Sequence, residues 1–135
     1  MTKFKKILLI EDDPITILVC DRILKMTGFG ETIVSKINGQ EAIDYLHNLI
    51  ELNEPLPEVI FLDINMPVKD GWQFLEEFKL MAPNIGKKIV IFMVSSSVDE
   101  YDIKKSKEYE VVTDYIIKPI NKDRFIELIT SAFNY

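Results

Sequence analysis

The sequence predicts a doubly wound α/β fold, in which helices cover both faces of a parallel β-sheet. Short apolar runs of strand length alternate five times with segments that carry apolar residues at helical spacing. Three of the runs, residues 7–10, 59–62 and 88–94, are apolar at nearly every position, as is typical of strands buried on both faces of a parallel sheet. Because crossovers between parallel strands are right-handed, few topologies fit this pattern. We expect a five-stranded sheet in one domain that spans residues 1–135.

The first half of the chain predicts two helices between three strands. The strand at residues 7–10 ends in acidic residues, and Pro14 then suits the first turn of a helix. A β-prone run at residues 32–34 precedes Asn38, which can cap a second helix before the strand at residues 59–62. The expected buried residues are Ile15, Leu18, Val19, Ile23 and Met26 in the first helix, and Ala42, Ile43, Leu46, Leu49 and Ile50 in the second.

The second half continues the alternation. Asp70 can cap a third helix, which leads to the strand at residues 88–94. Residues 98–109 have a helical composition but a thin apolar stripe, so we expect the least firmly held helix there. A fifth strand at residues 113–117 precedes Asn121, which can cap the last helix. The expected inward residues are Trp72, Leu75 and Phe78 in the third helix, and Phe125, Leu128, Ile129 and Ala132 in the last.

Composition narrows the function. Acidic residues outnumber basic ones by 22 to 16, and the net charge of −6 argues against binding to nucleic acid. Cys20 is the only cysteine, which excludes an internal disulfide or thiolate cluster and suits core packing in a reducing compartment. The apolar run at residues 7–10 is too short for a signal peptide, and no run reaches membrane length. We expect a soluble, cytoplasmic protein.

Residues able to bind a metal or a phosphoryl group follow four of the expected strands. Asp12 and Asp13 follow the first strand, Asp63 the third, Ser95 the fourth and Lys118 the fifth. In a flavodoxin-like strand order, 2-1-3-4-5, the first and third strands are neighbours, so their carboxylates should share a crevice. Carboxylates that close repel one another unless a cation lies among them. Oxygen ligands select a hard divalent ion, and we predict Mg²⁺ in preference to Ca²⁺.

The same edge of the sheet suits phosphoryl transfer. Lys118 can pair with Asp63 or with a phosphoryl oxygen, and Ser95 can donate a hydrogen bond to another such oxygen. Phosphoryl transfer needs little beyond this positioning and charge neutralisation. We predict that Asp63 is the nucleophile and forms an acyl phosphate.

Short motifs around these residues extend along essentially the whole chain: Ile10-Glu11-Asp12-Asp13, Leu62-Asp63-Ile64-Asn65-Met66-Pro67, Asp70-Gly71, Val94-Ser95-Ser96, Asp114-Tyr115 and Lys118-Pro119. Together they resemble the receiver domain of two-component response regulators. The resemblance implies that Asp63 is the phosphoacceptor. It also implies that Asp13, Asp63 and the backbone carbonyl of Asn65 bind Mg²⁺, while Asp12 acts through the water shell of the ion.

The resemblance further implies a conformational switch. Ser95 would be its hydroxyl, Tyr115 its aromatic residue, and Lys118 a salt-bridging lysine that in the family often precedes a cis proline. Ser95 replaces the commoner threonine, and the missing methyl should loosen the rotamer. Tyr115 could instead be a packed residue of an edge strand. The positions that tune phosphoryl lifetime in the family, here Asn65 and Ser97, carry no carboxylate, so we expect an ordinary lifetime.

The function that the resemblance implies is signalling. A histidine kinase or phosphotransfer protein would donate the phosphoryl group, and the surface of the fourth helix, fifth strand and fifth helix would change for an unidentified protein target. The expected unit is a single receiver domain, residues 1–135, without an output domain. It is expected not to be an enzyme, beyond self-catalysed phosphoryl transfer and autodephosphorylation.

Three alternatives use the same fold or site. A haloacid-dehalogenase-like Mg²⁺-dependent phosphatase needs a second aspartate two residues after its nucleophile, and Asn65 stands there. A flavin or nucleotide module needs a phosphate-cradling loop, which the five glycines do not form. A receiver-like domain that is never phosphorylated would lack some of the site residues, all of which are present.

Overall fold

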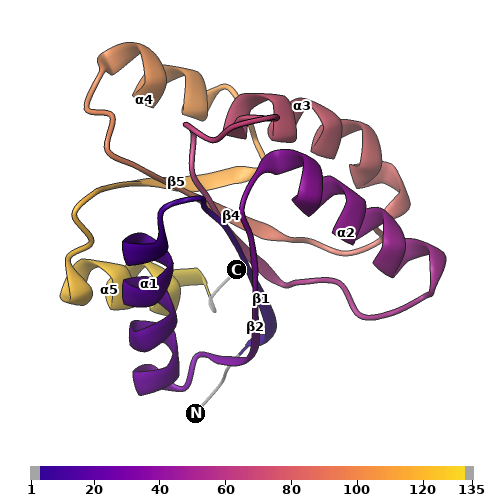
Figure 1. Cartoon of the computed structure of the whole chain (residues 1–135), viewed down its shortest axis with the longest axis horizontal. Coiled ribbons are helices and arrows are strands. Elements are labelled where there is room, and N and C mark those ends of the chain that lie inside the picture. Colours follow the sequence, from indigo (N-terminus) through magenta and orange to yellow (C-terminus); the bar gives the residue numbers. More distant parts are fainter. Residues whose placement is uncertain (1–3, 133–135) are drawn as a thin grey trace.

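A computed structural model describes residues 4–132 and shows one parallel sheet between two layers of helices (Figure 1). The strand order, β2-β1-β3-β4-β5, confirms the prediction. The strands are β1 (Phe4–Ile10), β2 (Gly30–Lys36), β3 (Val59–Leu62), β4 (Val90–Ser95) and β5 (Val112–Ile117). The helices are α1 (Pro14–Thr27), α2 (Gly39–Glu51), α3 (Gly71–Met81), α4 (Glu100–Lys107) and α5 (Lys122–Ala132), with a 3₁₀ turn at Ala82–Asn84. Within the described residues, no helix is both long and apolar enough to cross a membrane.

Each face of the sheet has its own apolar core, because side chains alternate between the faces along a strand. On the face covered by α1 and α5, the ring of Phe61 stacks on those of Phe92 and Phe125, with centroids 5.5 and 4.9 Å apart. On the face covered by α2 and α3, Leu8 and Ile60 pack in the second core. All four residues of β3 are buried, so this strand holds its carboxyl end in a fixed position.

Polar caps fix where the helices begin. The side chain of Asn38 accepts a hydrogen bond from the Glu41 amide at the start of α2, and Asp70 forms a capping box with Gln73 at the start of α3. Both caps confirm the predictions. At Gly71, a Cβ atom would lie 2.4 Å from the backbone carbonyl oxygen of Asp63. Only glycine therefore lets α3 begin this close to the end of β3.

The predicted buried face of α1 is wrong at four of its five positions, and only Ile23 is buried as predicted. Ile15, Leu18 and Met26 are 71%, 52% and 64% exposed, whereas Cys20 and Leu24 are buried. The helix carries two apolar stripes at helical spacing, and periodicity cannot decide which stripe meets the sheet. The inner stripe contains Cys20, whose predicted role in core packing is confirmed. The outer stripe leaves an apolar surface on α1.

The structure of α4 agrees with its thin apolar stripe. Of its residues, Glu100–Lys107, Ser106 alone is buried in the described part of the chain. Contacts outside the core hold the helix instead. The ammonium group of Lys105 lies 4.7 Å from the ring centroid of Trp72, and that ring stacks on Tyr109 just beyond α4. Polar and cation–π contacts therefore position this helix.

Candidate functional site

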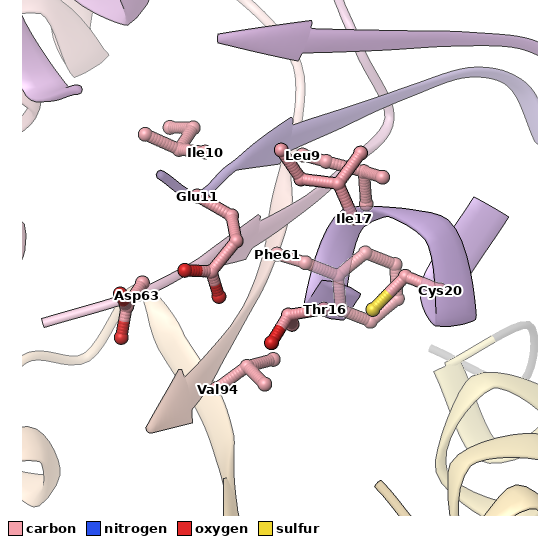
Figure 2. A pocket seen from close by; sticks show the side chains of 9 residues that line it. All are labelled: Leu9, Ile10, Glu11, Thr16, Ile17, Cys20, Phe61, Asp63 and Val94. Carbon is pink, nitrogen blue, oxygen red and sulfur yellow. The ribbon is translucent and has the colours of Figure 1, made fainter. Parts of the chain in front are cut away.

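Three carboxylates converge where β1 and β3 end. Ile10 and Leu62 are partners in the sheet register, so the residues that follow them, Glu11 and Asp63, emerge side by side. Among the described residues, carboxylate oxygens of Glu11, Asp12 and Asp63 lie within 4.8 Å of one another. Figure 2 shows the side chains of Glu11 and Asp63 reaching toward the same space. Glu11 and Asp63 are each 5% exposed, whereas Asp12 is open to solvent.

The expectation that Asp13 joins this cluster needs correction, because Glu11 takes that place. The carboxylate of Asp13 caps α1: it accepts hydrogen bonds from the Ile15 amide at 3.2 Å and from the Thr16 hydroxyl at 2.7 Å. The backbone amide of Glu11 still bonds to β2, so Glu11 continues the strand and faces its partner on β3. The signal in the sequence is that Glu11 and Asp63 each directly follow the last apolar residue of their strand, but the pairing of Ile10 with Leu62 comes from the structure.

Lys118 brings a positive charge to the cluster, as predicted. Its Nζ lies 2.8 Å from Oε1 of Glu11 and 3.7 Å from Oδ1 of Asp63. The backbone amide of Lys118 donates to the Ser95 carbonyl at 2.8 Å, which fixes the lysine beside the end of β4. Burial alone would lower the pKa of Lys118, but the hydrogen bond to Glu11 and the charges of Asp63 and Glu11 outweigh it and raise that pKa. The peptide bond from Lys118 to Pro119 is cis.

Asp63 lies in surroundings that disfavour its charged form. A small cavity beside it is lined largely by apolar groups, including Leu9, Phe61 and Val94 (Figure 2). Burial, together with the hydrogen bond and the charge of Glu11, raises the pKa of Asp63 to about 7, against the opposing effects of Lys118 and the Ile64 amide. The lysine offsets only part of the negative charge of the three carboxylates. A bound cation would stabilise the ionised cluster.

The donor chemistry of the cluster fits a hard divalent metal ion. The cluster offers carboxylate oxygens from Glu11, Asp12 and Asp63, the type of atom that Mg²⁺, Mn²⁺ and Ca²⁺ prefer. Asn65 is exposed two residues beyond Asp63. The binding role expected of its backbone carbonyl stays a prediction.

The two expected switch residues meet at Ser97. Ser95 is fully buried at the end of β4, and its Oγ accepts a hydrogen bond from the Ser97 amide at 3.1 Å. Tyr115 is half-buried on β5, and its hydroxyl donates to the Ser97 carbonyl at 3.0 Å. Tyr115 thus has a polar partner in the loop that follows Ser95. The sequence did not predict that Ser97 would bond to both Ser95 and Tyr115.

The fold and this site define a class of signalling domain, and comparison with known proteins gives its family. A family model described as the response regulator receiver domain matches residues 7–130, and the chain belongs to this family. The chain is 33% identical to response regulator Rcp1 of Synechocystis over 90% of this chain and 82% of that protein. It is 31% identical to the phosphate regulon transcriptional regulatory protein PhoB of Escherichia coli over 95% of this chain, but it spans only 51% of that relative.

Solved structures agree with this membership. A two-component response regulator from Cytophaga hutchinsonii superposes with a TM-score of 0.86 at 32% identity, over 98% of this chain and 99% of that one. The Mn²⁺-bound form of Rcp1 gives a TM-score of 0.76 at 28% identity, over 97% and 93% of the two chains. The chain is thus a receiver domain of the phosphoacceptor type, a signalling module. The comparisons do not support the haloacid-dehalogenase alternative.

Proposed function

We propose that Asp63 accepts a phosphoryl group from a phosphohistidine donor and that the modified domain passes the signal to a downstream protein. One observation carries the proposal: the Lys118 ammonium group lies within 4 Å of both Glu11 and Asp63, beside the acidic cluster. A carboxylate nucleophile needs a positive partner that lowers the cost of its charge and later contacts the transferred group. The position of Lys118 supports both tasks.

The residues of this chain have distinct tasks in the transfer. A carboxylate oxygen of Asp63 attacks the phosphorus atom of the donor, and the P–N bond to the donor imidazole breaks as the new O–P bond forms. Lys118 lowers the cost of ionising Asp63 and pairs with one phosphoryl oxygen, while the hydroxyl of Ser95 donates to another. Glu11, Asp12 and Asp63 would hold Mg²⁺, together with the Asn65 carbonyl. When bound, the ion neutralises charge on the phosphoryl oxygens.

The proposed output is a change at the surface of α4, β5 and α5. The hydroxyl of Ser95 turns toward the phosphoryl group, and Tyr115 follows into the space beside it. The hydrogen bonds of Ser97 support this coupling, because Ser95 and Tyr115 each bond to the backbone of Ser97. A protein target that binds the altered surface would receive the signal.

The proposed donor is a histidine kinase or a phosphotransfer protein that docks beside Asp63. The exposed apolar side chains of Ile15 and Val19 on α1 line one groove with Lys118, Pro119 and Ile120. An apolar surface at the rim of the site could hold a donor protein while its histidine reaches Asp63. We place this activity in the cytoplasm, a proposal supported by the single, buried cysteine.

The proposal is tested by phosphorylation with a small donor, acetyl phosphate. We expect Mg²⁺-dependent labelling of the wild type that is lost in Asp63→Ala. Glu11→Gln should require a higher concentration of Mg²⁺ for half-maximal labelling. Asp13→Asn makes a matched control, because its side-chain oxygen can still accept the hydrogen bond from the Ile15 amide at the start of α1. This variant should require the same concentration of Mg²⁺ as the wild type. Equal labelling of wild type and Asp63→Ala would refute the proposal.

A further inference from the structure

Ser97 makes four hydrogen bonds, which link it to the end of β4, to β5, to α4 and to the residue that precedes α4. Its amide donates to Oγ of Ser95 at 3.1 Å, and its carbonyl accepts from the Tyr115 hydroxyl at 3.0 Å. Its own hydroxyl donates to Oδ2 of Asp102 at 2.6 Å and accepts from the Asp99 amide at 3.3 Å. The bond to Asp102 is the shortest of the four and the only one of them with a charged side chain, and such bonds are about twice as strong as neutral ones.

Asp102 is a residue of α4, whose attachment to the rest of the molecule includes few apolar contacts. Since Ser106 alone of the described residues of α4 is buried, polar bonds carry much of the attachment. Asp102 is half-buried and faces Ser97, while Glu100, two residues earlier, is exposed. The two acids therefore differ in position, although they share a helical turn and a charge.

The hydroxyl of Ser95 needs an external constraint. A serine lacks the second Cβ substituent that restricts the rotamer of threonine. The Ser97 amide supplies a constraint, because it occupies one lone pair of the Ser95 oxygen and leaves the hydroxyl proton for another acceptor. This bond holds only while the Ser97 backbone stays in place. The bond from the Ser97 side chain to Asp102 ties that backbone to α4.

We propose that Asp102 is a positioning residue for phosphoryl transfer at Asp63, acting through Ser97 on the hydroxyl of Ser95. The inference rests on the proposed function. Asp102 does not touch the reacting atoms, and its carboxylate stands outside the Glu11, Asp12 and Asp63 cluster. Through Ser97, Asp102 sets the fraction of time that the Ser95 hydroxyl points its proton at the phosphoryl group. The same bonds couple phosphorylation of Asp63 to the position of α4.

The proposal predicts a particular kinetic pattern for Asp102→Ala. Addition of the phosphoryl group to Asp63 and its later loss to water pass through transition states that share the Ser95 contact. Both rates should fall by a similar factor of about three to ten, the range set by one hydrogen bond. The Mg²⁺ concentration for half-maximal labelling should not change, because the metal-binding carboxylates are untouched.

A double-mutant cycle with Ser97→Ala tests the route of the effect. Labelling by acetyl phosphate and decay of the label are measured in wild type, Asp102→Ala, Ser97→Ala and the double variant. Both single changes remove the same bond, so Asp102→Ala should have no further effect in the Ser97→Ala background. Glu100→Ala, with the same loss of charge in the same turn, should label like wild type. Asp102→Asn, which retains an acceptor oxygen, should recover part of the rate and replaces Asp102→Ala if that variant fails to fold.

Three results would overturn the inference: wild-type rates in Asp102→Ala, an undiminished effect of Asp102→Ala in the Ser97→Ala background, or an equal effect of Glu100→Ala. The last two would mean that Asp102 acts by charge and not through Ser97. Absence of labelling in the wild type is a different outcome, which would refute the proposed function and this inference with it.

Discussion

The metal-free domain should become more stable when Asp63 is replaced by asparagine. Burial and the neighbouring Glu11 raise the pKa of Asp63 to about 7 in the folded state, against 3.8 for the free side chain. The folded state therefore holds the proton more tightly than the unfolded state does. As pH rises from about 4 to 7, the folded state must give up this proton at a cost, so stability falls across that window and then levels off. Asparagine has no ionisable proton, so the stability of Asp63→Asn should not fall across this pH window.

The size of the stabilisation follows from the difference in the pKa of Asp63 between the folded and unfolded states. A difference of about three pKa units corresponds to an upper value of about 4 kcal/mol once both states are ionised, at about pH 8. Asparagine can still accept the hydrogen bond from the Ile64 amide, and Lys118 keeps its bond to Glu11. We therefore expect Asp63→Asn to raise the free energy of unfolding by about 2–4 kcal/mol at about pH 8, and by about 2 kcal/mol less at about pH 5.5.

Urea unfolding of both proteins, monitored by circular dichroism with EDTA present, measures this difference. Added Mg²⁺ should then stabilise the wild type more than Asp63→Asn, because the proposed binding site in the folded state contains the Asp63 carboxylate. Equal stability of the two proteins at about pH 8, or a difference independent of pH, would show that burial of the Asp63 charge does not carry the cost we assign to it.

Three further substitutions or modifications test the structure around the site. Val68 adopts a φ of 66°, in the left-handed region that asparagine tolerates better than valine, and its side chain is 79% exposed. Val68→Asn should therefore raise the free energy of unfolding, measured with urea, by about 1 kcal/mol. Val98→Asn, at an exposed site without positive φ, should leave the free energy of unfolding unchanged. Gly71→Ala should lower the free energy of unfolding by at least about 2 kcal/mol, because the new Cβ would meet the Asp63 carbonyl oxygen. A variant as stable as the wild type would contradict this close approach. Burial raises the pKa of Cys20 to about 12, so an alkylating reagent should modify it only at the rate of unfolding, and rapid modification of the folded protein would refute its burial.

The parts of the site that sequence predicts best depend on strand ends. Asp63, Ser95 and Lys118 each follow an apolar run, and parallel strands bring their carboxyl ends to one edge, so the sheet topology alone brings them together. The choice between Glu11 and Asp13 needed the register of β1 with β3 and the start of α1, which a run of three acids does not fix.

Other features depend on contacts that no local pattern encodes. The rotation of α1 is set by packing of Cys20 and Leu24 on the sheet, since the outer stripe with Ile15 has the same periodicity. The bond between Ser97 and Asp102 depends on how the loop after β4 folds back on α4. Sequence spacing gave no signal for this pair.

The central claim is that Asp63 carries the phosphoryl group in a site made by Glu11, Asp12 and Lys118. The most direct measurement locates the group after reaction with acetyl phosphate and Mg²⁺, by borohydride reduction, which converts an aspartyl phosphate to homoserine, and peptide mass spectrometry. Homoserine should occur at position 63 and only when Mg²⁺ is present. Homoserine at Asp12 or Asp13, or at position 63 without a divalent ion, would contradict the account.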